Sequence, residues 1–589
     1  MSFKLFYKSC AVLLIALITG GGSLNLIAQD LLGGADGGRD IEGGGSVAVL
    51  ATFSQTRKKA RRIEARPTQV RRPIVALAHA PKQDPDPRPT PTPRPTATAE
   101  SFVQRGEAAL KDSEYLKALS SFQKAVKLKP GLPEAQDGLG NSLFSLTRFE
   151  EAVGPYKEAI KLRPDWAEPR NSLADTLYNL NHDDEAIEQY KETVRLNPKA
   201  GRAFFNMGQI YFEQSKVNEA AEAFQHASEI NPKDADASYD LGLALLKLKK
   251  DKEAIEPLRL STTVRPTYAL AFYKLGEAYE NTEQLPEAAE AYKQASTIRP
   301  DFFEANYNLA VVLYNLGKMD EAAQAYRKVV LTKPDDAESV ENLADALKRT
   351  GKYVEAATQY RQLLKLKPDD PDALAGLGYV YNMVGQYGDA IEAYKKLARV
   401  APNRSDAYTN MGAALGKQKQ WQLSIDALNQ AVKLNPKDAE AYSNLGWAYN
   451  NLGRYPEAVD VLQKSVQLKP DSAPANFNLG ISLSRTGKFS DATSSFERAL
   501  QYKPDWPEAY NNLGFAYGNL KRWDKAISAH QQAVRLKPDY AGAYFNLGYD
   551  YLGKGDKQRA SQQYEMLKPI NPALADKLMN LIKDGIKRK

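Results

Sequence analysis

Large apolar residues, small residues and prolines recur along most of the chain with a constant period of 34 residues. Fourteen prolines, from Pro130 to Pro572, keep this spacing without an insertion or a deletion. Within each period, large apolar residues stand at helical spacing in two stretches, and Tyr442, Leu445 and Tyr449 belong to one of them. The pattern therefore predicts one pair of helices copied fourteen times.

Two small residues per period predict how the paired helices pack. A glycine or alanine, such as Gly140 or Gly514, stands 24 residues before each proline, and a second small residue stands 12 before it. That second residue is alanine in every copy except the tenth, which has Ser424. Because short side chains allow close approach of two backbones, we expect the two helices to cross at these points.

Polar residues and glycines predict where the helices begin and end. An acid follows the repeat proline in several copies and a glutamate stands three residues later, as at Asp165 and Glu168. This spacing predicts a capping box at the start of the first helix. Glycines share a second register, where that helix is expected to end and the chain to turn back: Gly317, Gly351, Gly385, Gly453, Gly487 and Gly555.

The repeated motifs, written W-x2-L-G-x2-Y, A-x3-F and P, resemble the tetratricopeptide repeat (TPR) family over residues 99–574. The resemblance implies an all-α fold, a right-handed α-solenoid superhelix of fourteen TPR helix-turn-helix units. After the last unit, Leu574, Leu578, Leu581 and Ile582 form one apolar stripe. This stripe predicts a C-terminal capping helix over residues 575–589.

The first 29 residues have the composition of a targeting segment. Lys4 and Lys8 precede an apolar run over residues 10–18, which predicts a signal peptide cleaved after Gly22 or Ala28. An exported protein, periplasmic or extracellular, is the expectation. An uncleaved membrane anchor and an accidental apolar start are the alternatives. The single cysteine lies in this segment, so the mature chain is expected to carry no thiol or disulfide chemistry.

Residues 30–98 have the composition of a disordered linker that is in turn Gly-rich, basic and Pro-rich. Residues 57–95 contain eleven Lys or Arg against three acids, whereas the whole chain carries a net charge of only +7. The repeats are therefore close to neutral overall, which argues against nucleic acid as a partner. A solvated tether is favoured for the basic run, and contact with an anionic surface is the alternative. The run consists of Arg57, Lys58, Lys59, Arg61, Arg62, Arg66, Arg71 and Arg72.

No catalytic, metal or cofactor site is predicted. The four histidines occupy different registers of the repeat, and no His, Cys or carboxylate pair stands at a typical metal-ligand spacing. The Gly-rich stretch at residues 33–45 lacks the GK[ST] ending of a phosphate-binding loop. We therefore expect a protein that is not an enzyme.

The face of the first helix that points away from the packed positions is the predicted binding surface. At about 100° per residue, this face comprises the second, sixth, ninth and thirteenth positions of each unit. Asparagine recurs at the sixth position, and its amide can both donate to and accept from the backbone of an extended peptide. The predicted peptide-binding asparagines are Asn206, Asn308, Asn342, Asn410, Asn444, Asn478, Asn512 and Asn546.

This row of asparagines is similar to the ladder inside the superhelix of O-linked N-acetylglucosamine transferases. The resemblance covers the repeats only and includes no catalytic domain, so it implies a peptide-holding groove and not the transferase activity. The alternative for the row is a structural role, in which each asparagine bonds to a neighbouring helix and holds the pitch of the superhelix.

Aromatic residues also lie on or beside this face. Trp447, Phe515 and Tyr549 occupy the ninth position, and a ligand-contacting role is favoured for them. Packing between repeats is favoured for four aromatics at the fifth position, Phe205, Tyr239, Tyr273 and Tyr307.

The sequence thus predicts a protein–protein interaction scaffold that binds extended peptide segments in the concave groove of its repeats. One alternative is a non-catalytic targeting subunit of a separately encoded modifying enzyme, such as a glycosyltransferase. Another is an envelope adaptor attached through the basic linker, with membrane contact only if the N-terminal segment stays uncleaved.

Overall fold

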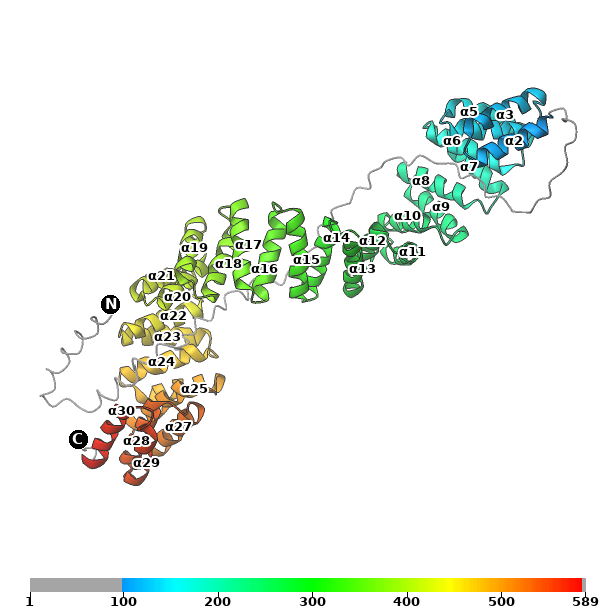
Figure 1. The fold of residues 1–589 in the computed structure, drawn as a ribbon. Coiled ribbons are helices and arrows are strands. Elements are labelled where there is room, and N and C mark those ends of the chain that lie inside the picture. The colour runs from blue at the N-terminus through cyan, green and yellow to red at the C-terminus, as the bar shows by residue number, and fades with distance from the viewer. Residues whose placement is uncertain (1–97, 585–589) are drawn as a thin grey trace, which may run out of the picture. The chain divides into compact units, whose positions relative to one another are not determined.

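The computed structural model describes residues 98–584, which form helices joined by short turns and contain no strand (Figure 1). This confirms the all-α solenoid predicted from the sequence. None of the helices in the described region is both long and apolar enough to cross a bilayer. The predictions of a signal segment over residues 1–29 and of a linker over residues 30–98 fall, except for Thr98, outside the described residues and stay predictions.

Each repeat is a hairpin of a first helix, here called the A helix, and a second helix, the B helix. The A helices are α2 (Ala99–Lys111), α4 (Pro133–Ser145), α6 (Ala167–Asn179), α8 (Gly201–Glu213), α10 (Ala235–Lys247), α12 (Ala269–Asn281), α14 (Phe303–Asn315), α16 (Ala337–Arg349), α18 (Pro371–Met383), α20 (Ser405–Lys417), α22 (Ala439–Asn451), α24 (Ala473–Arg485), α26 (Pro507–Asn519) and α28 (Ala541–Lys554). The B helices are α3 (Tyr115–Leu128), α5 (Phe149–Leu162), α7 (Asp183–Leu196), α9 (Val217–Ile230), α11 (Asp251–Val264), α13 (Leu285–Ile298), α15 (Met319–Thr332), α17 (Tyr353–Leu366), α19 (Tyr387–Val400), α21 (Trp421–Leu434), α23 (Tyr455–Leu468), α25 (Phe489–Tyr502), α27 (Trp523–Leu536) and α29 (Lys557–Leu567).

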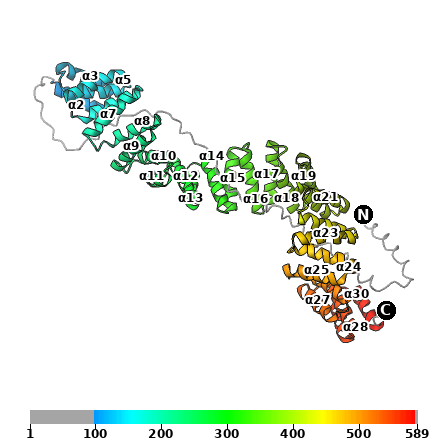
Figure 2. The same cartoon turned by 180° about the vertical axis from the view of Figure 1, so that it is seen from behind.

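The described residues fall into two compact units, 98–346 and 347–584, and α16 contains the boundary. Within each unit, successive hairpins stack side by side, as both views show (Figures 1 and 2). A helix packs against its partner in the hairpin and against the next helix along the chain. Stability is therefore distributed along the stack, because each repeat touches mainly its neighbours.

Glycine at the eighth position of the repeat permits the close crossing of the A and B helices. A Cβ atom added at Gly140 would lie 2.6 Å from the ring of Tyr156, and one at Gly446 would lie 2.2 Å from Leu462. Separations this short are not tolerated, so a side chain here would push the B helix away. The predicted crossing point is confirmed.

The turn from the A helix to the B helix uses a left-handed residue. The six glycines predicted for this turn have φ between 74° and 90°. Eight repeats place a residue with a side chain at the same position, with φ between 56° and 62°, including Lys249, Glu283, Lys419 and Lys521. Because a Cβ atom is strained in this conformation, these eight turns are less stable than the glycine turns.

The predicted capping boxes are wrong by one residue. Helices α6, α14 and α26 have Trp166, Phe302 and Trp506 at the N-cap, and none of these side chains caps the helix. Where a side chain does cap an A helix, it belongs to the residue directly before the helix, as with Asp234 and Asp438. The acid after the proline therefore stands one residue before the N-cap in these helices.

In two repeats, a glutamate at the capping-box position instead pairs with the end of the B helix of the same repeat. Glu134 forms an ion pair with Arg163, and Glu508 lies 3.7 Å from Lys537. Both pairs are partly exposed, so each adds little to stability.

Helix α30 (Pro572–Asp584) covers the end of the last hairpin and packs against α28 and α29. Leu574 and Leu578 are buried, and Leu581 and Ile582 pack beside them. A Cβ atom at Gly548 would meet the side chain of Leu578, so α30 fills the place that the B helix fills in other repeats. This apolar stripe forms the capping helix, which begins at Pro572.

Candidate peptide-binding face

In the structure, the sixth position of the A helix is less exposed to solvent than a helical wheel drawn for one hairpin indicates. Seven of the eight predicted asparagines are buried, with exposed fractions of 2–8%, and Asn410 is half-buried. Three of them, Asn206, Asn308 and Asn546, bond to the preceding repeat. For example, the amide of Asn206 donates to Asp175 Oδ1 at 2.9 Å and to the Tyr190 hydroxyl at 3.3 Å. The preceding repeat therefore closes over a face that the sequence pattern leaves uncovered.

Besides Asn206, three asparagines in the row use their amides within the protein. Asn308 Nδ2 lies 3.4 Å from the Tyr292 hydroxyl, and Asn546 Nδ2 donates to Asn511 Oδ1 at 3.0 Å. Asn512 Nδ2 donates to the backbone carbonyl of Glu508 at 2.8 Å. At these positions the asparagine has the structural role that was the alternative interpretation.

Asn410, Asn444 and Asn478 differ from the rest of the row. Among the described residues, the side-chain amide nitrogens of these three have no hydrogen-bond partner. They belong to three consecutive A helices, α20, α22 and α24. Asn444 Nδ2 is also fully shielded from solvent, so its donor capacity is unused at a cost in free energy.

The Trp447 indole, on the same helix as Asn444, has a second unused donor. Its Nε1 is shielded from solvent and has no partner in the described part of the chain. The side chain is buried, and its ring lies 5.0 Å from the ring of Trp421 in an edge-to-face arrangement. Trp447 thus combines a packed ring with an unsatisfied polar atom.

The ninth-position aromatics pack between repeats. Besides Trp447, Phe515 is buried and Tyr549 is half-buried. Their rings lie 6.2 Å from Phe489 and 6.5 Å from Trp523, respectively, at the start of the preceding B helix. These contacts give all three residues a structural role, and their predicted contact with a ligand stays a prediction.

The fifth-position aromatics also pack, as the sequence favoured. Tyr239, Tyr273 and Tyr307 are buried and Phe205 is half-buried. The ring of Tyr273, for example, lies 5.0 Å from Phe302, which closes the same repeat. Similar ring contacts surround the other three residues.

Carboxylates gather on the A helices of the first three repeats. Glu107 of α2 and Glu168 of α6 are exposed, and Glu134 and Asp137 of α4 are half-buried. Burial, together with the neighbouring charges of Glu168, Glu134 and Glu107, raises the pKa of Asp137 to about 7. The four carboxylates are therefore close enough to repel one another. We call these residues the acidic cluster.

A chain of hydrogen bonds ends at Asp137. The Tyr156 hydroxyl donates to Asn141 Oδ1 at 2.9 Å, and Asn141 Nδ2 donates to Asp137 Oδ2 at 2.8 Å. The other oxygen, Asp137 Oδ1, is shielded from solvent and accepts no hydrogen bond in the described residues. The chain thus fixes one oxygen and leaves the second without a donor.

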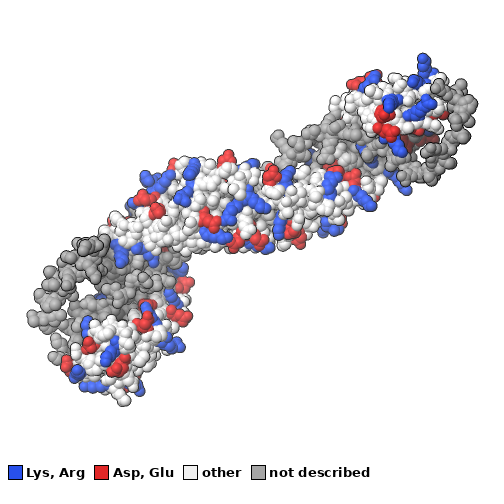
Figure 3. Space-filling view, in the orientation of Figure 1, with Lys and Arg blue, Asp and Glu red and all other residues white. Residues whose placement is uncertain are grey.

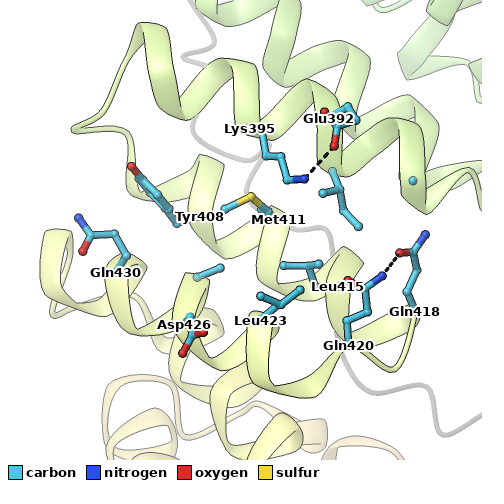
Figure 4. A pocket seen from close by; sticks show the side chains of 13 residues that line it. Glu392, Lys395, Tyr408, Met411, Leu415, Gln418, Gln420, Leu423, Asp426 and Gln430 are labelled. Atoms are coloured by element: carbon cyan, nitrogen blue, oxygen red, sulfur yellow. Dashed lines mark hydrogen bonds and ion pairs between the residues drawn. The ribbon is translucent and has the colours of Figure 1, made fainter.

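A groove that the sequence analysis missed lies on the opposite face of α20, between α19 and α21 (Figure 4). It encloses about 470 Å³ above Met411 and Leu415, and Glu392 and Lys395 form an ion pair of 2.8 Å on one wall. Leu423 lines the groove and is 55% exposed. Every other repeat carries a charged residue at this position, so the substitution was visible in the sequence.

Three histidines lie in the described residues: His182, His226 and His530. No group of three or more His, Cys, Asp or Glu side chains in residues 98–584 is placed to hold a metal ion. His530 is fully buried and bonds to Asp550 and to the carbonyl of Asn511. The packing role predicted for this histidine fits its position against Gly514.

Charged residues of both signs are interspersed over the visible face of the repeats (Figure 3).

The hairpins match models of a known repeat family. Family models described as Tetratricopeptide repeat match residues 103–167, 273–337, 341–406, 409–473 and 507–540. A model described as TPR repeat matches residues 174–215, 208–249 and 483–521, and together the matches span more than half of the chain. The chain belongs to the tetratricopeptide repeat family. As a TPR protein it is a protein-interaction scaffold.

Several solved structures are similar to parts of the chain. The crystal structure of the APC/C hetero-tetramer Cut9-Hcn1 contains a chain 18% identical, with a TM-score of 0.35, over 82% of this chain and 96% of that one. The MamA protein is 24% identical over 31% of this chain and 97% of its own, with a TM-score of 0.27. YrrB, described as a TPR protein with an unusual peptide-binding site, is 27% identical over 32% of this chain and 96% of its own, with a TM-score of 0.28. No curated protein matches the chain.

Proposed function

We propose that this TPR protein is a non-catalytic scaffold that binds extended peptide segments along the A-helix face of repeats 10–12. One observation carries the proposal: the amides of Asn410, Asn444 and Asn478 have no partner in the described residues, whereas other asparagines in the row are bonded. Unused donors in consecutive repeats are what the carbonyl groups of a peptide backbone would satisfy.

The unused donors also indicate the geometry of binding. Asn444 Nδ2 and Trp447 Nε1 are shielded from solvent, so a peptide reaches them only after their side chains rotate. The free-energy cost of this rotation is offset by the two hydrogen bonds that the peptide accepts, because unsatisfied buried donors cost about 1–3 kcal/mol each. Each contact is weak, and affinity comes from repetition along the peptide.

A peptide selection on the full-length chain tests the proposal. Peptides selected from a random library would be labelled, and their affinity measured by fluorescence anisotropy for the wild type and for a variant with Asn410, Asn444 and Asn478 changed to alanine. We expect the variant to bind at least about tenfold more weakly, since each lost bond contributes about 0.5–1.5 kcal/mol.

The control variant changes three asparagines that directly follow B helices to alanine: Asn197, Asn231 and Asn435. Their side chains are exposed and lie off the A-helix face. Unchanged affinity in this control, together with loss in the first variant, supports the proposal. Equal affinity of the wild type and the first variant contradicts it.

A further inference from the structure

The A helices of repeats 10–13 end in a stretch that carries positive charge only. The ninth to sixteenth positions of these repeats contain seven Lys or Arg and no acid over residues 413–420, 447–454, 481–488 and 515–522. The same positions of repeats 1–7 contain seven Lys or Arg and eight acids. The excess of positive charge is therefore a local property of repeats 10–13 and not of the whole array.

Most of these cations have no anionic partner within the protein. Arg454 forms an ion pair of 2.9 Å with Glu457. The other six make no ion pair in residues 98–584: Lys417, Lys419, Arg485, Lys488, Lys521 and Arg522. Arg485 is half-buried and the other five are exposed. Because the neighbouring A helices contact one another, these six cations follow one another along one side of the repeats, which we call the basic edge.

The basic edge lies beside the amides proposed to bind a peptide. Lys417 follows Asn410 on α20 by seven residues, and Arg485 follows Asn478 on α24 by the same interval. Seven residues are close to two helical turns, so each cation stands about 10 Å along the helix from its asparagine, on the same face. Lys417 Nζ also lies 5.8 Å from the centre of the Trp447 ring, whose Nε1 is the second unused donor.

We infer that the peptide segment bound at repeats 10–12 is acidic and directs its carboxylate side chains to the basic edge. The inference rests on the proposed function and adds the chemical class of the peptide. Lysine and arginine form charge-assisted hydrogen bonds with carboxylates, whereas the edge would repel a basic segment. The amides on the same helices suit a peptide backbone, which favours an acidic polypeptide over nucleic acid.

The period of the array also predicts the spacing of the acidic residues. Neighbouring packed helices lie about 8–10 Å apart, and an extended peptide advances about 3.3–3.6 Å per residue. About three peptide residues therefore span one repeat, so an acid at every third position meets the cations of successive repeats. Exposed ion pairs are individually weak, and affinity comes from their number.

Two labelled peptides test the inference on the full-length chain, one with five copies of Glu-Thr-Ser and one with five copies of Gln-Thr-Ser. At 20 mM NaCl we expect fluorescence anisotropy to show at least about tenfold tighter binding of the glutamate peptide. This difference should disappear at 500 mM NaCl, because salt screens exposed charges. Equal affinity for the two peptides at 20 mM NaCl overturns the inference. Tighter binding of a 15-nucleotide single-stranded DNA than of the glutamate peptide also overturns it, in favour of nucleic acid.

A charge variant locates the contact. Changing Lys417, Arg485, Lys488 and Arg522 to glutamine should weaken binding of the glutamate peptide at least about fivefold at 20 mM NaCl. The matched control removes two lysines and two arginines that are exposed on the B helices of the same repeats, with Lys433, Lys464, Arg498 and Arg535 each changed to glutamine. Equal affinity of the two variants for the glutamate peptide overturns the inference.

Failure of this inference and failure of the proposed function give different results. The variant with Asn410, Asn444 and Asn478 changed to alanine loses contacts to the peptide backbone and should weaken both peptides alike. Weaker binding by this variant, with no effect of the charge variant, supports the proposed function and overturns the acidic preference. Weaker binding by the charge variant alone supports contact at the basic edge and contradicts the proposed backbone contacts.

Discussion

His530 Nδ1 lies 2.6 Å from Asp550 Oδ2, and both side chains are buried. His530 replaces the large apolar residue that other repeats place at this position, and Asp550 replaces a small or apolar one in the next repeat. His530 Nε2 lies 3.1 Å from the carbonyl of Asn511, so both ring nitrogens face polar partners. Two departures from the repeat pattern thus compensate each other.

Removing one partner of this pair should lower the stability of the protein much more than replacing both. Asp550→Ala leaves the His530 ring buried with one nitrogen unpaired, at a cost of about 2–4 kcal/mol. The double variant Asp550→Ala, His530→Tyr restores residue types used in other repeats and should recover most of that stability. Hydrogen exchange of α27 and α28 measures the local effect, and equal exchange in the single and double variants would contradict the coupling.

The A-to-B turns offer a direct way to stabilise the protein. Lys419 and Lys521 have φ of 59° and 56°, where glycine is unstrained. Changing either to glycine should raise the free energy of unfolding by up to about 1 kcal/mol, whereas Gly453→Ala should lower it by about 1–2 kcal/mol. Denaturant unfolding checks both signs. A loss of stability in both lysine variants would show that these turns are not strained.

Two substitutions at Trp447 distinguish a packing role from a binding role. Trp447→Ala removes a buried ring that contacts Trp421 and should cost about 3–5 kcal/mol of stability. Trp447→Phe keeps an aromatic ring but removes Nε1, so stability should fall much less while affinity for the selected peptides falls several-fold. Thermal unfolding and fluorescence anisotropy provide the two measurements. Unchanged peptide affinity of the phenylalanine variant would assign Trp447 to packing alone.

Asp137 should make stability depend on pH. Its pKa of about 7 in the folded chain exceeds the usual value near 4 in the unfolded chain, so its contribution is complete below about pH 4 and is lost as the pH rises to about 7. Asp137→Asn should therefore gain stability over the wild type across that range, by on the order of 2–4 kcal/mol in total.

The measurement for Asp137 is denaturant unfolding at pH 4 and pH 8 at the same low ionic strength, so that salt does not screen the neighbouring carboxylates. Glu150→Gln, at an exposed site on α5, is the control and should show no such trend. A constant difference between Asp137→Asn and the wild type at both pH values would contradict the shifted pKa.

The period of the sequence was sufficient to predict the hairpins, the close crossing at Gly140 and the left-handed turns, because each depends on contacts within one repeat. The burial of Asn206 and the pairing of Trp447 with Trp421 depend on the preceding repeat, which a wheel drawn for one helix omits. The capping prediction failed for a different reason. A shift of one residue decides whether an acid reaches the free N–H groups, and spacing alone does not fix helix starts that finely.

The groove beside α20 shows what a repeat pattern can still reveal. Leu423 is the one uncharged residue at its register, and the structure places it on the wall of that groove. In a repeated sequence, a departure from the consensus is a stronger indication of a special site than the consensus itself. Asn410, Asn444 and Asn478 had no such signal, because bonded and unbonded asparagines look alike in sequence.

Helix α30 also limits how this array can be engineered. Leu578 occupies the site against Gly548 that a B-helix side chain fills in the other repeats, so the stacking surface of the final hairpin is already sealed. A fusion that adds another hairpin after residue 567 would have to expel this helix first. Lengthening the protein is therefore best done by inserting a whole 34-residue module upstream, where both new interfaces copy existing ones.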